Sequence, residues 1–451
     1  MQTHGFDAET DELADEVIRY ARERLALDPP PLDAPTSFEE LCEAAGATIT
    51  EAGLGPEALR IFRDILAPAC ISTDHPRYLS FIPCAPTEAS SMFDLVVGAS
   101  GIYGGSWMEG AGAVYAENQA LRWIADLAGM PPQAGGAFVQ GGTIGNLSAL
   151  VAARADAQRR RGGRPERWVV ACGSEAHSSI EHAALVMDID ILAVPVGLDG
   201  RMTGAALAEA LAARGGSDDV FAVVATGGTT NYGIVDDLDG ISRVCRERGI
   251  WMHVDGAYGL AALAAPSTRA HFAGVEHADS LIVDPHKWLF APFDACALLY
   301  RNPELARAAH VQHAAYLDVL TDRTDWNPSD YAVQLSRRAR GLPFWFSLAV
   351  HGTQAYADAV ERTMEVARFA EQSVRESAYL ELIRDPMLSV VVFRRIGWTE
   401  RDYQEWSDRL LAEGYAFVVP TKHEGETVTR VAIVNPRTTE EDITGIIASM
   451  A

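Results

Sequence analysis

Lysine is almost absent from this chain. Of its 37 basic residues only Lys287 and Lys422 are lysines, and all the others are arginines. A chain that uses arginine wherever a surface cation suffices keeps a lysine for chemistry that arginine cannot perform, such as forming an imine. The alternative is a lysine that has simply persisted at the surface, and the local context has to decide between the two.

Cysteine is sparse and unpatterned. The cysteines are scattered and contain no CxxC pair, which argues against a disulfide framework and against a zinc site. This usage is typical of a reducing compartment, so we expect a cytoplasmic protein. The six residues are Cys42, Cys70, Cys84, Cys172, Cys245 and Cys296.

Positive charge is in deficit, and long apolar runs are missing. With 62 acidic and 37 basic residues, the formal net charge is −25 at pH 7. Such a surface repels phosphate backbones and anionic lipids, which argues against nucleic acids and membranes as partners. Apolar runs such as LSVVVF fall far short of the roughly 18 residues that span a bilayer, and the acidic N-terminus shows no signal peptide. We expect a soluble protein.

The 451 residues suffice for two or three domains. Between about 90 and 300, short apolar runs alternate with helical patterns, which predicts a mostly parallel, doubly wound α/β sheet. The candidate strands are GGAFVQ, RWVVACG, DILAVPV, FAVVATG, WMHVD, SLIVD and CALLYR. After about residue 340 the pattern predicts a smaller α+β domain, and an amphipathic helix is expected near the N-terminus, over about 9–27.

Polar residues follow several predicted strands, at the edge where such sheets bind ligands. GGTIGN (141–146) opens a helix and is either a phosphate cradle or a tight turn without a ligand. Asp255 ends the strand WMHVD, and its carboxylate is either an ordinary helix cap or an acidic group of a ligand-binding site. His177 is either a structural hydrogen-bonding residue or a planar group that stacks on a cofactor. Lys287, in DPHKW after SLIV, is placed to act as a nucleophile toward a carbonyl.

Together these residues match the requirements of pyridoxal 5'-phosphate. The cofactor needs a phosphate cup, a lysine for the imine and an acid near its pyridine nitrogen. The acid keeps that nitrogen protonated, so that the ring can accept the electrons of a carbanion.

Lys422, in the turn-like PTKHEGE, fits an ordinary surface lysine.

The chain resembles the group II pyridoxal-phosphate-dependent amino acid decarboxylases, which include aromatic amino acid, glutamate and diaminobutyrate decarboxylases. The resemblance extends from HPRYLSFIP to NPRTTEED. The segments that carry it are HPRYLSFIPCAPT, GGSWMEGAGAVYAE, FVQGGTIGNLSALVAAR, EAHSSIEHA, ATGGTTNYGIVDDL, HVDGAYG, ADSLIVDPHKW and LSRRARGLPFW.

The resemblance implies a type I fold of pyridoxal-phosphate-dependent transferases, similar to aspartate aminotransferase. This fold has a mostly parallel seven-stranded sheet and a smaller C-terminal α+β domain. The implied division is an N-terminal helical segment over 1–75 that wraps the partner subunit, a large cofactor-binding domain over 76–340 and a small domain over 341–451. The protein would be a homodimer with active sites at the interface.

The resemblance also implies roles for individual residues. Lys287 would form the internal aldimine, Asp255 would pair with the pyridinium, and His177 would stack on the ring and assist proton transfer at the quinonoid. The other expected cofactor-binding residues are Gly142, Thr143, Thr230, Ala257 and His286. The residues expected at the substrate are Thr87, Trp107, Tyr103 and Arg437.

Two segments depart from the family pattern. The loop that carries a catalytic tyrosine in aromatic decarboxylases looks shorter here, and that tyrosine falls near Pro328. Tyr331 is the nearest replacement and is taken as the catalytic tyrosine, with Tyr316 as another candidate. Gly104 and Gly105 replace a bulky aromatic residue, which either opens the pocket or only reshapes a loop.

The sequence therefore predicts a carboxy-lyase that converts an L-amino acid, with aromatic substrates favoured, to its amine and CO2. One alternative is an aldehyde synthase, because loss of the loop tyrosine would favour oxidation of the quinonoid by oxygen. Others are a decarboxylase of acidic or other non-aromatic amino acids and a non-catalytic relative. A Rossmann dinucleotide enzyme is excluded because GGTIGN lacks the GxGxxG spacing. No metal is expected.

Overall fold

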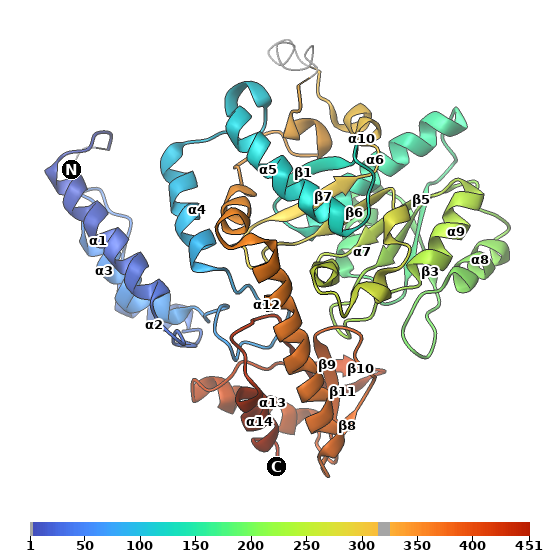
Figure 1. Ribbon diagram of the computed structural model, residues 1–451. Helices are drawn as coiled ribbons and strands as arrows, with labels where there is room; N and C mark the ends of the chain where they lie inside the picture. The colour runs from blue at the N-terminus through green and yellow to red at the C-terminus, as the bar shows by residue number, and fades with distance from the viewer. Residues whose placement is uncertain (1–2, 314–324) are drawn as a thin grey trace.

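A computed structural model describes residues 3–313 and 325–451 of the chain (Figure 1). Its central sheet has seven strands in the order β1-β7-β6-β5-β4-β2-β3. All of them run in one direction except β7, which is antiparallel to both of its neighbours. The strands are β1 (Gly135–Val139), β2 (Val169–Gly173), β3 (Asp190–Val194), β4 (Val220–Thr226), β5 (Trp251–Asp255), β6 (Ser280–Val283) and β7 (Cys296–Tyr300).

Each apolar run that the sequence analysis took for a strand is a strand of this sheet, so the predicted fold class is confirmed. The central strands are buried on both faces, as expected for parallel strands between two helical layers. In β2, Val169 and Ala171 pack into one hydrophobic layer, whereas Val170 and Cys172 pack into the other. This alternation fixes which side chains meet which layer.

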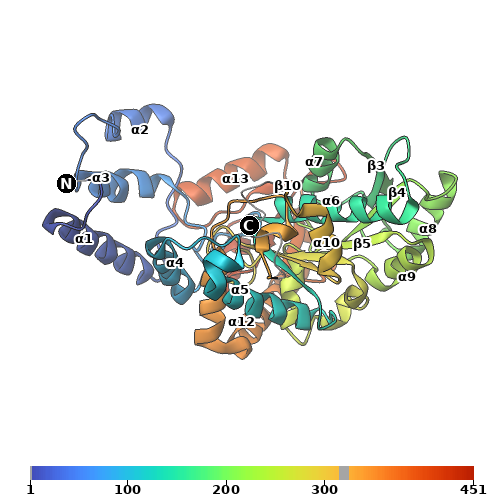
Figure 2. The ribbon, with the colours of Figure 1, turned by 90° about the horizontal axis from the view of Figure 1, so that it is seen from above.

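Helices cover both faces of the sheet (Figure 2). On one face lie α6 (Gly142–Arg161), α7 (Ser178–Met187) and α10 (Pro303–His310). On the other lie α5 (Trp107–Leu127), α8 (Gly204–Ala213), α9 (Leu238–Arg248) and the first part of α12 (Leu342–Glu376). Helix α12 is interrupted at Gly352, whose φ of 77° favours glycine.

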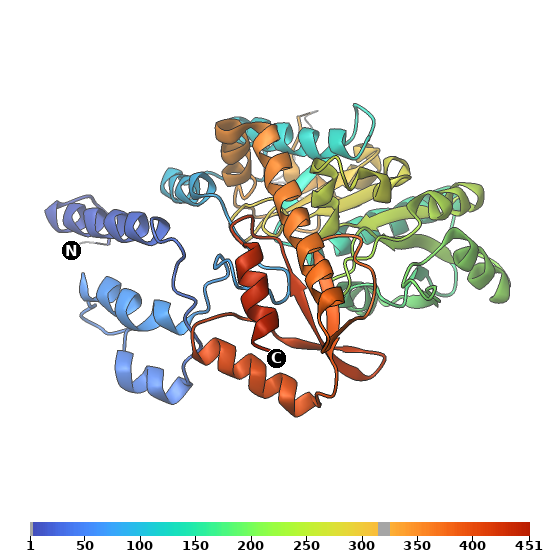
Figure 3. The same cartoon turned by 60° about the horizontal axis from the view of Figure 1, so that its bottom comes forward.

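The C-terminal region forms the smaller α+β domain that the sequence predicted. Its four-stranded antiparallel sheet has the order β10-β11-β9-β8. The elements are β8 (Leu380–Leu382), β9 (Val390–Arg395), α13 (Glu400–Ala412), β10 (Pro420–His423), β11 (Glu426–Ala432) and α14 (Glu440–Ala448). Helix α12 runs down from the large domain into this region, where α14 packs beside it (Figure 3).

A segment from early in the chain completes the small domain. The backbone N–H of Leu79 donates to the carbonyl of Phe417 at 3.0 Å, and the N–H of Ala432 donates to the carbonyl of Leu79 at 2.9 Å. The apolar residues 415–419, just before β10, therefore pair with this early segment and not with β11. Instead, Phe417 bridges to Tyr78.

The N-terminal helices project from one side of the molecule (Figure 2). They are α1 (Ala8–Leu25), α2 (Phe38–Ala45) and α3 (Glu57–Ile61), and α4 (Glu88–Ser100) follows closer to the body. Helix α1 buries none of its residues, and Val17 and Ile18 of its apolar stripe are 36% and 53% exposed. No helix in the described ranges is long and apolar enough to cross a membrane.

Candidate active site

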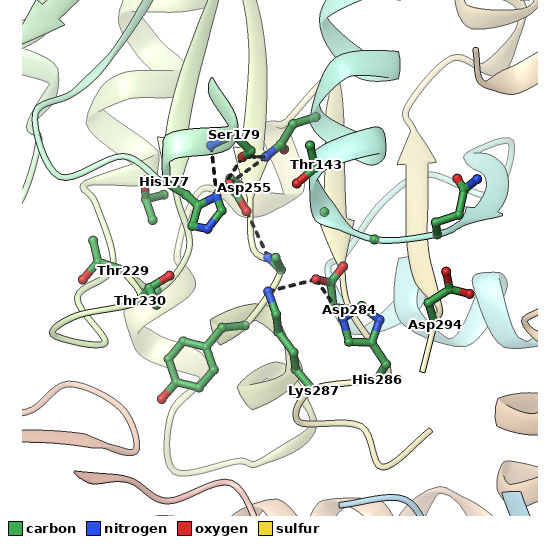
Figure 4. A pocket seen from close by; sticks show the side chains of 18 of the residues that line it. Thr143, His177, Ser179, Thr229, Thr230, Asp255, Asp284, His286, Lys287 and Asp294 are labelled. Atoms are coloured by element: carbon green, nitrogen blue, oxygen red, sulfur yellow. Dashed lines mark hydrogen bonds and ion pairs between the residues drawn. The ribbon is translucent and has the colours of Figure 1, made fainter. Parts of the chain in front are cut away.

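The carboxyl ends of neighbouring parallel strands surround a cavity of about 330 Å³ (Figure 4). Because these strands share one direction, the residues that follow them gather at one edge of the sheet. The cavity is lined by Gln140, Gly141, Gly142, Thr143, Asn146, His177, Ser179, Thr226, Gly228, Thr229, Thr230, Asp255, Ala257, Tyr258, Asp284, His286, Lys287, Phe293 and Asp294. All the residues that the sequence predicted to bind the cofactor are in this set.

A glycine-rich turn forms one end of the cavity. The chain passes from β1 through Gly141 into α6, whose N-terminus has no side-chain cap. A Cβ atom added at Gly142 would lie 3.2 Å from Cβ of Ala257 and 3.3 Å from Oδ2 of Asp284, so only glycine leaves this space free. Unsatisfied N–H groups and the helix dipole make such a terminus attractive to an anion.

Lys287 forms an ion pair inside the cavity. Its Nζ lies 2.9 Å from Oδ2 of Asp284, and Nε2 of His286 lies 3.6 Å from the same oxygen. Burial lowers the pKa of Lys287, but the charge and hydrogen bond of Asp284, together with the charge of Asp255, outweigh this effect and raise the net pKa above its ordinary value. Burial raises the pKa of Asp284, but Lys287 and His286 bring the net pKa below its ordinary value.

Asp255 is held by donors at the end of β5. The carboxylate is only 6% exposed and accepts hydrogen bonds from Nδ2 of Asn146 at 2.9 Å and from the backbone N–H of Ala257 at 3.2 Å. These donors stabilise an ionised carboxylate in a buried position. Asp255 is therefore a fixed negative charge that faces the cavity.

His177 precedes α7 and is fixed by that helix. Its Nδ1 accepts the backbone N–H of Ser179 at 3.1 Å and lies 2.9 Å from the Ser179 hydroxyl. Figure 4 shows the opposite edge of the ring facing the cavity, above the Lys287 amine. The ring is thus anchored on one side and presented on the other.

Thr87 and Arg437, two of the residues expected at the substrate, lie together at a different cavity. This second cavity measures about 240 Å³ and does not include any residue that lines the first. Thr87 caps α4 and its hydroxyl lies 2.7 Å from that of Ser347. Arg437 pairs with Asp28 at 3.5 Å and donates to the carbonyl of Asp74 at 3.2 Å.

The aromatic residues expected at the substrate also lie outside the lining of the first cavity. Tyr103 donates its hydroxyl to the Leu335 carbonyl at 2.9 Å. Trp107 is the first residue of α5. None of the four residues expected at the substrate lines the first cavity, so their substrate-binding roles stay predictions.

The predicted catalytic tyrosine is part of the core. Tyr331 is 2% exposed, and its ring stacks on Trp326 with 4.3 Å between centroids. It does not line the cavity. The other candidate, Tyr316, lies outside the described residues.

Several residues at or beside the cavity escaped the sequence analysis, among them Asp284, Asn146 and Arg430. Asp284 is the first letter of DPHKW, and Asn146 lies one helical turn after Gly142, so an i, i+4 relation could have found it. Arg430 on β11 is 5% exposed and donates to the carbonyl of Thr230 at 3.0 Å. Burial lowers its pKa to about 10, so it stays charged at neutral pH.

The cavity fits pyridoxal phosphate. It offers an uncapped helix N-terminus for a phosphate, an amine for an aldehyde and a buried carboxylate for a ring nitrogen. Glycine at position 142 lets the start of α6 pack closely against Ala257 and Ile282, which brings its free N–H groups to the edge of the cavity. Among the described residues, no group of three or more His, Cys, Asp or Glu side chains forms a metal site.

Comparisons with known proteins point the same way. Residues 55–396 match the conserved domain of pyridoxal-dependent decarboxylases. The chain is 30% identical to an aromatic-L-amino-acid decarboxylase of Bacillus atrophaeus, covering 83% of this chain and 80% of the relative. It is 29% identical to an L-2,4-diaminobutyrate decarboxylase of Rhizobium meliloti, covering 88% and 81%. The fold is similar to that of Oryza sativa TDC with PLP and tryptamine, with a TM-score of 0.89, 24% identity and coverage of 100% and 99%.

Replacing Asp284 by Asn should let cofactor uptake begin at lower pH. The carboxylate stabilises protonated Lys287, and only the unprotonated amine reacts with an aldehyde. Removing this charge lowers the pKa of Lys287 and enlarges the neutral fraction at a given pH. The measurement is an absorbance titration of cofactor-free protein with pyridoxal phosphate over a pH series.

Asp294→Asn is the matched control for this titration. Asp294 also lines the cavity, but it pairs with Arg340 and not with Lys287. Its variant should keep the wild-type pH dependence. An unshifted titration of Asp284→Asn would show that the ion pair does not control the reactivity of Lys287.

Proposed function

Since this chain belongs to the pyridoxal-dependent decarboxylase family and is a pyridoxal phosphate-dependent amino acid decarboxylase, we propose that it converts an aromatic L-amino acid to the amine and CO2. The observation that carries the proposal is the match to an aromatic-L-amino-acid decarboxylase over most of both chains. The lining supports it: Asp255, Asp284 and Asp294 face the cavity without any arginine, which disfavours an acidic substrate. Tyr258 and Phe293 add aromatic surface.

The residues that would hold the cofactor are divided between the two ends of the cavity. The N–H groups at the start of α6, with Gly142 and Thr143, would bind the phosphate, and His286 is close to the same turn. Lys287 would attach to the aldehyde. When bound, pyridoxal phosphate supplies an electron sink that takes up the electron pair of the broken bond at the substrate Cα.

Other residues would control protons and orientation. Asp255, ionised and fixed by Asn146, would hold a proton on the cofactor's ring nitrogen. His177 would lie against the ring and present Nε2 to the reacting side, where a proton is needed at the substrate carbon. Ala257 would contact the opposite ring face, and Thr230 the cofactor's edge.

Arg430 is our candidate for the substrate carboxylate. The part of the chain that the structure describes contains no carboxylate within ion-pairing distance of Arg430. The residue it touches, Thr230, lines the cavity. Arg437, by contrast, is occupied by Asp28.

Arg430→Gln should therefore lower kcat/KM about 100-fold, as expected when a buried partner of a charged group is removed. Arg437→Gln is the comparison variant and should stay within about threefold of wild type, because rim charges contribute little. The measurement is steady-state kinetics of both variants, with the substrate identified by the product screen described next. It decides whether Arg430 or Arg437 binds the substrate carboxylate. A large loss in Arg437→Gln with a normal Arg430→Gln would reverse the assignment.

The function itself is tested by a mass-spectrometric product screen over aromatic, imidazole, acidic and diamino acids, with purified protein and pyridoxal phosphate. An aromatic amine with CO2 is expected, and Lys287→Ala should yield none. An amine from a non-aromatic amino acid would overturn the substrate proposal. An aldehyde with ammonia and peroxide would replace the proposed product by that of an oxidative reaction.

We further propose that the enzyme is a homodimer, with residues 1–75 wrapping the partner, 76–340 binding the cofactor and 341–451 forming the small domain. An exposed apolar stripe on α1 supports this, because such a stripe requires a partner surface. Helix α4 adds Met92, Leu95 and Val96, which are about half exposed.

Deleting residues 1–50 should shift the protein from dimer to monomer in light scattering. The double variant Val17→Ser, Ile18→Ser should weaken the dimer in the same direction while keeping the helix. A matched surface change on the polar side of α1, such as Arg19→Gln, should have no effect. A deletion variant with an unchanged dimer would refute the wrapping role.

A further inference from the structure

Behind the cavity, buried polar side chains form one connected chain of hydrogen bonds. It begins at Trp251 and ends at Asp255 and His177. Trp251 Nε1 lies 2.8 Å from Ser280 Oγ, which lies 2.8 Å from Nδ1 of His253. On the other side of that ring, Nε2 lies 2.8 Å from Oδ1 of Asn146. Nδ2 of the same amide lies 2.9 Å from both Asp255 Oδ2 and Ser179 Oγ. His253 and Ser280 are 0% exposed and Asn146 is 1% exposed, so water cannot substitute for these contacts.

The chemistry of each group fixes the direction of the first bonds. An indole N–H only donates, so the Ser280 oxygen accepts from Trp251. Among the described residues, the buried Ser280 hydroxyl has no partner besides this indole and Nδ1 of His253, so its hydrogen points to Nδ1. Burial lowers the pKa of His253 to about 4, so its ring is neutral at neutral pH. A neutral ring that accepts at Nδ1 carries its hydrogen at Nε2, which donates to Oδ1 of Asn146.

This donation selects the orientation of the Asn146 amide. With Oδ1 toward His253, the amide nitrogen faces Asp255 and Ser179 and donates to both. The flipped amide would place its oxygen against the Asp255 carboxylate and its N–H₂ against the N–H of His253. The first contact would place two acceptors against each other and the second two donors. Unpaired polar groups in a buried site cost free energy, so this orientation is disfavoured.

The same direction continues to His177. Since Ser179 Oγ accepts from Asn146, its hydrogen points to Nδ1 of His177, which also accepts the backbone N–H of Ser179. A neutral His177 therefore carries its hydrogen at Nε2, on the ring edge that faces the cavity in Figure 4.

We propose that His253 and Asn146 are positioning residues, which together hold Asp255 and His177 in the orientation that the cofactor requires. Neither residue touches the reacting atoms through this role. His253 acts by setting the amide, and the amide acts by donating to both cavity residues. The proposal rests on the cofactor and not on the aromatic substrate.

The test uses the holoenzyme with pyridoxal phosphate labelled with 15N in the ring. In His253→Phe, the Asn146 amide is no longer held in the orientation that donates to Asp255, and a carboxylate with a weakened donor is more basic. The 15N resonance should therefore move toward that of unprotonated pyridine. The dissociation constant of the cofactor should rise about tenfold, in line with a lost hydrogen bond to a charged group. His253→Gln, whose amide can donate to Asn146, should restore both values to within about threefold of wild type.

His310→Phe is the matched control. His310 is also buried, but its Nε2 bonds to the backbone carbonyl of Ser148 and not to the Asn146 amide. Its variant should keep the wild-type resonance and affinity, whatever its melting temperature. If His253→Phe does not fold, Asn146→Leu serves instead, because leucine cannot donate to Asp255 and should shift the resonance in the same direction.

An unchanged 15N resonance and an unchanged dissociation constant in His253→Phe, or in Asn146→Leu, would overturn the proposal. A lower melting temperature alone would assign a merely structural role and would overturn it as well. Both readouts concern the bound cofactor and need no substrate. A failed product screen therefore leaves this test interpretable, and a failure here leaves the proposed reaction untouched.

Discussion

The common direction of the parallel strands is the constraint on which the active site depends. Because β1, β2, β4, β5 and β6 end at one edge, a glycine turn, a histidine, two carboxylates and a lysine from distant parts of the sequence share one cavity. Reversing a single strand would remove its group from the site. The helical layers contribute mainly by burying both faces of the sheet, which keeps those strand ends fixed.

Charge compensation determines how these groups coexist in a small space. The Lys287 amine is paired with Asp284, and the Asp255 carboxylate is satisfied by an amide and a backbone N–H. Buried charges persist only when they are paired or hydrogen-bonded in this way. The same rule distinguishes two arginines of the small domain. Arg437 is already paired with the carboxylate of Asp28, whereas Arg430 donates to the backbone carbonyl of Thr230.

The sequence sufficed for the sheet and for the cavity residues that follow its strands, because both are local patterns. Lys287 stood out through rarity, and Asp255 and His177 through their positions after apolar runs. Arg430 could not be found this way, since its neighbour Thr230 is 200 positions away and only the packing of two domains brings them together. The role of Tyr331 stays a prediction, and the pattern alone could not show that this tyrosine stacks on Trp326 in the core.

The pairing of Leu79 with Phe417 and Ala432 has a consequence for how the chain is made. Ser80 and its acceptor Phe417 are separated by 337 positions. On the ribosome, the segment that completes the small domain emerges long before its partners are synthesised, and it has to wait unpaired while the large domain folds. Contacts of such high sequence separation form late and slowly. The small domain can therefore close only once nearly the whole chain has been synthesised.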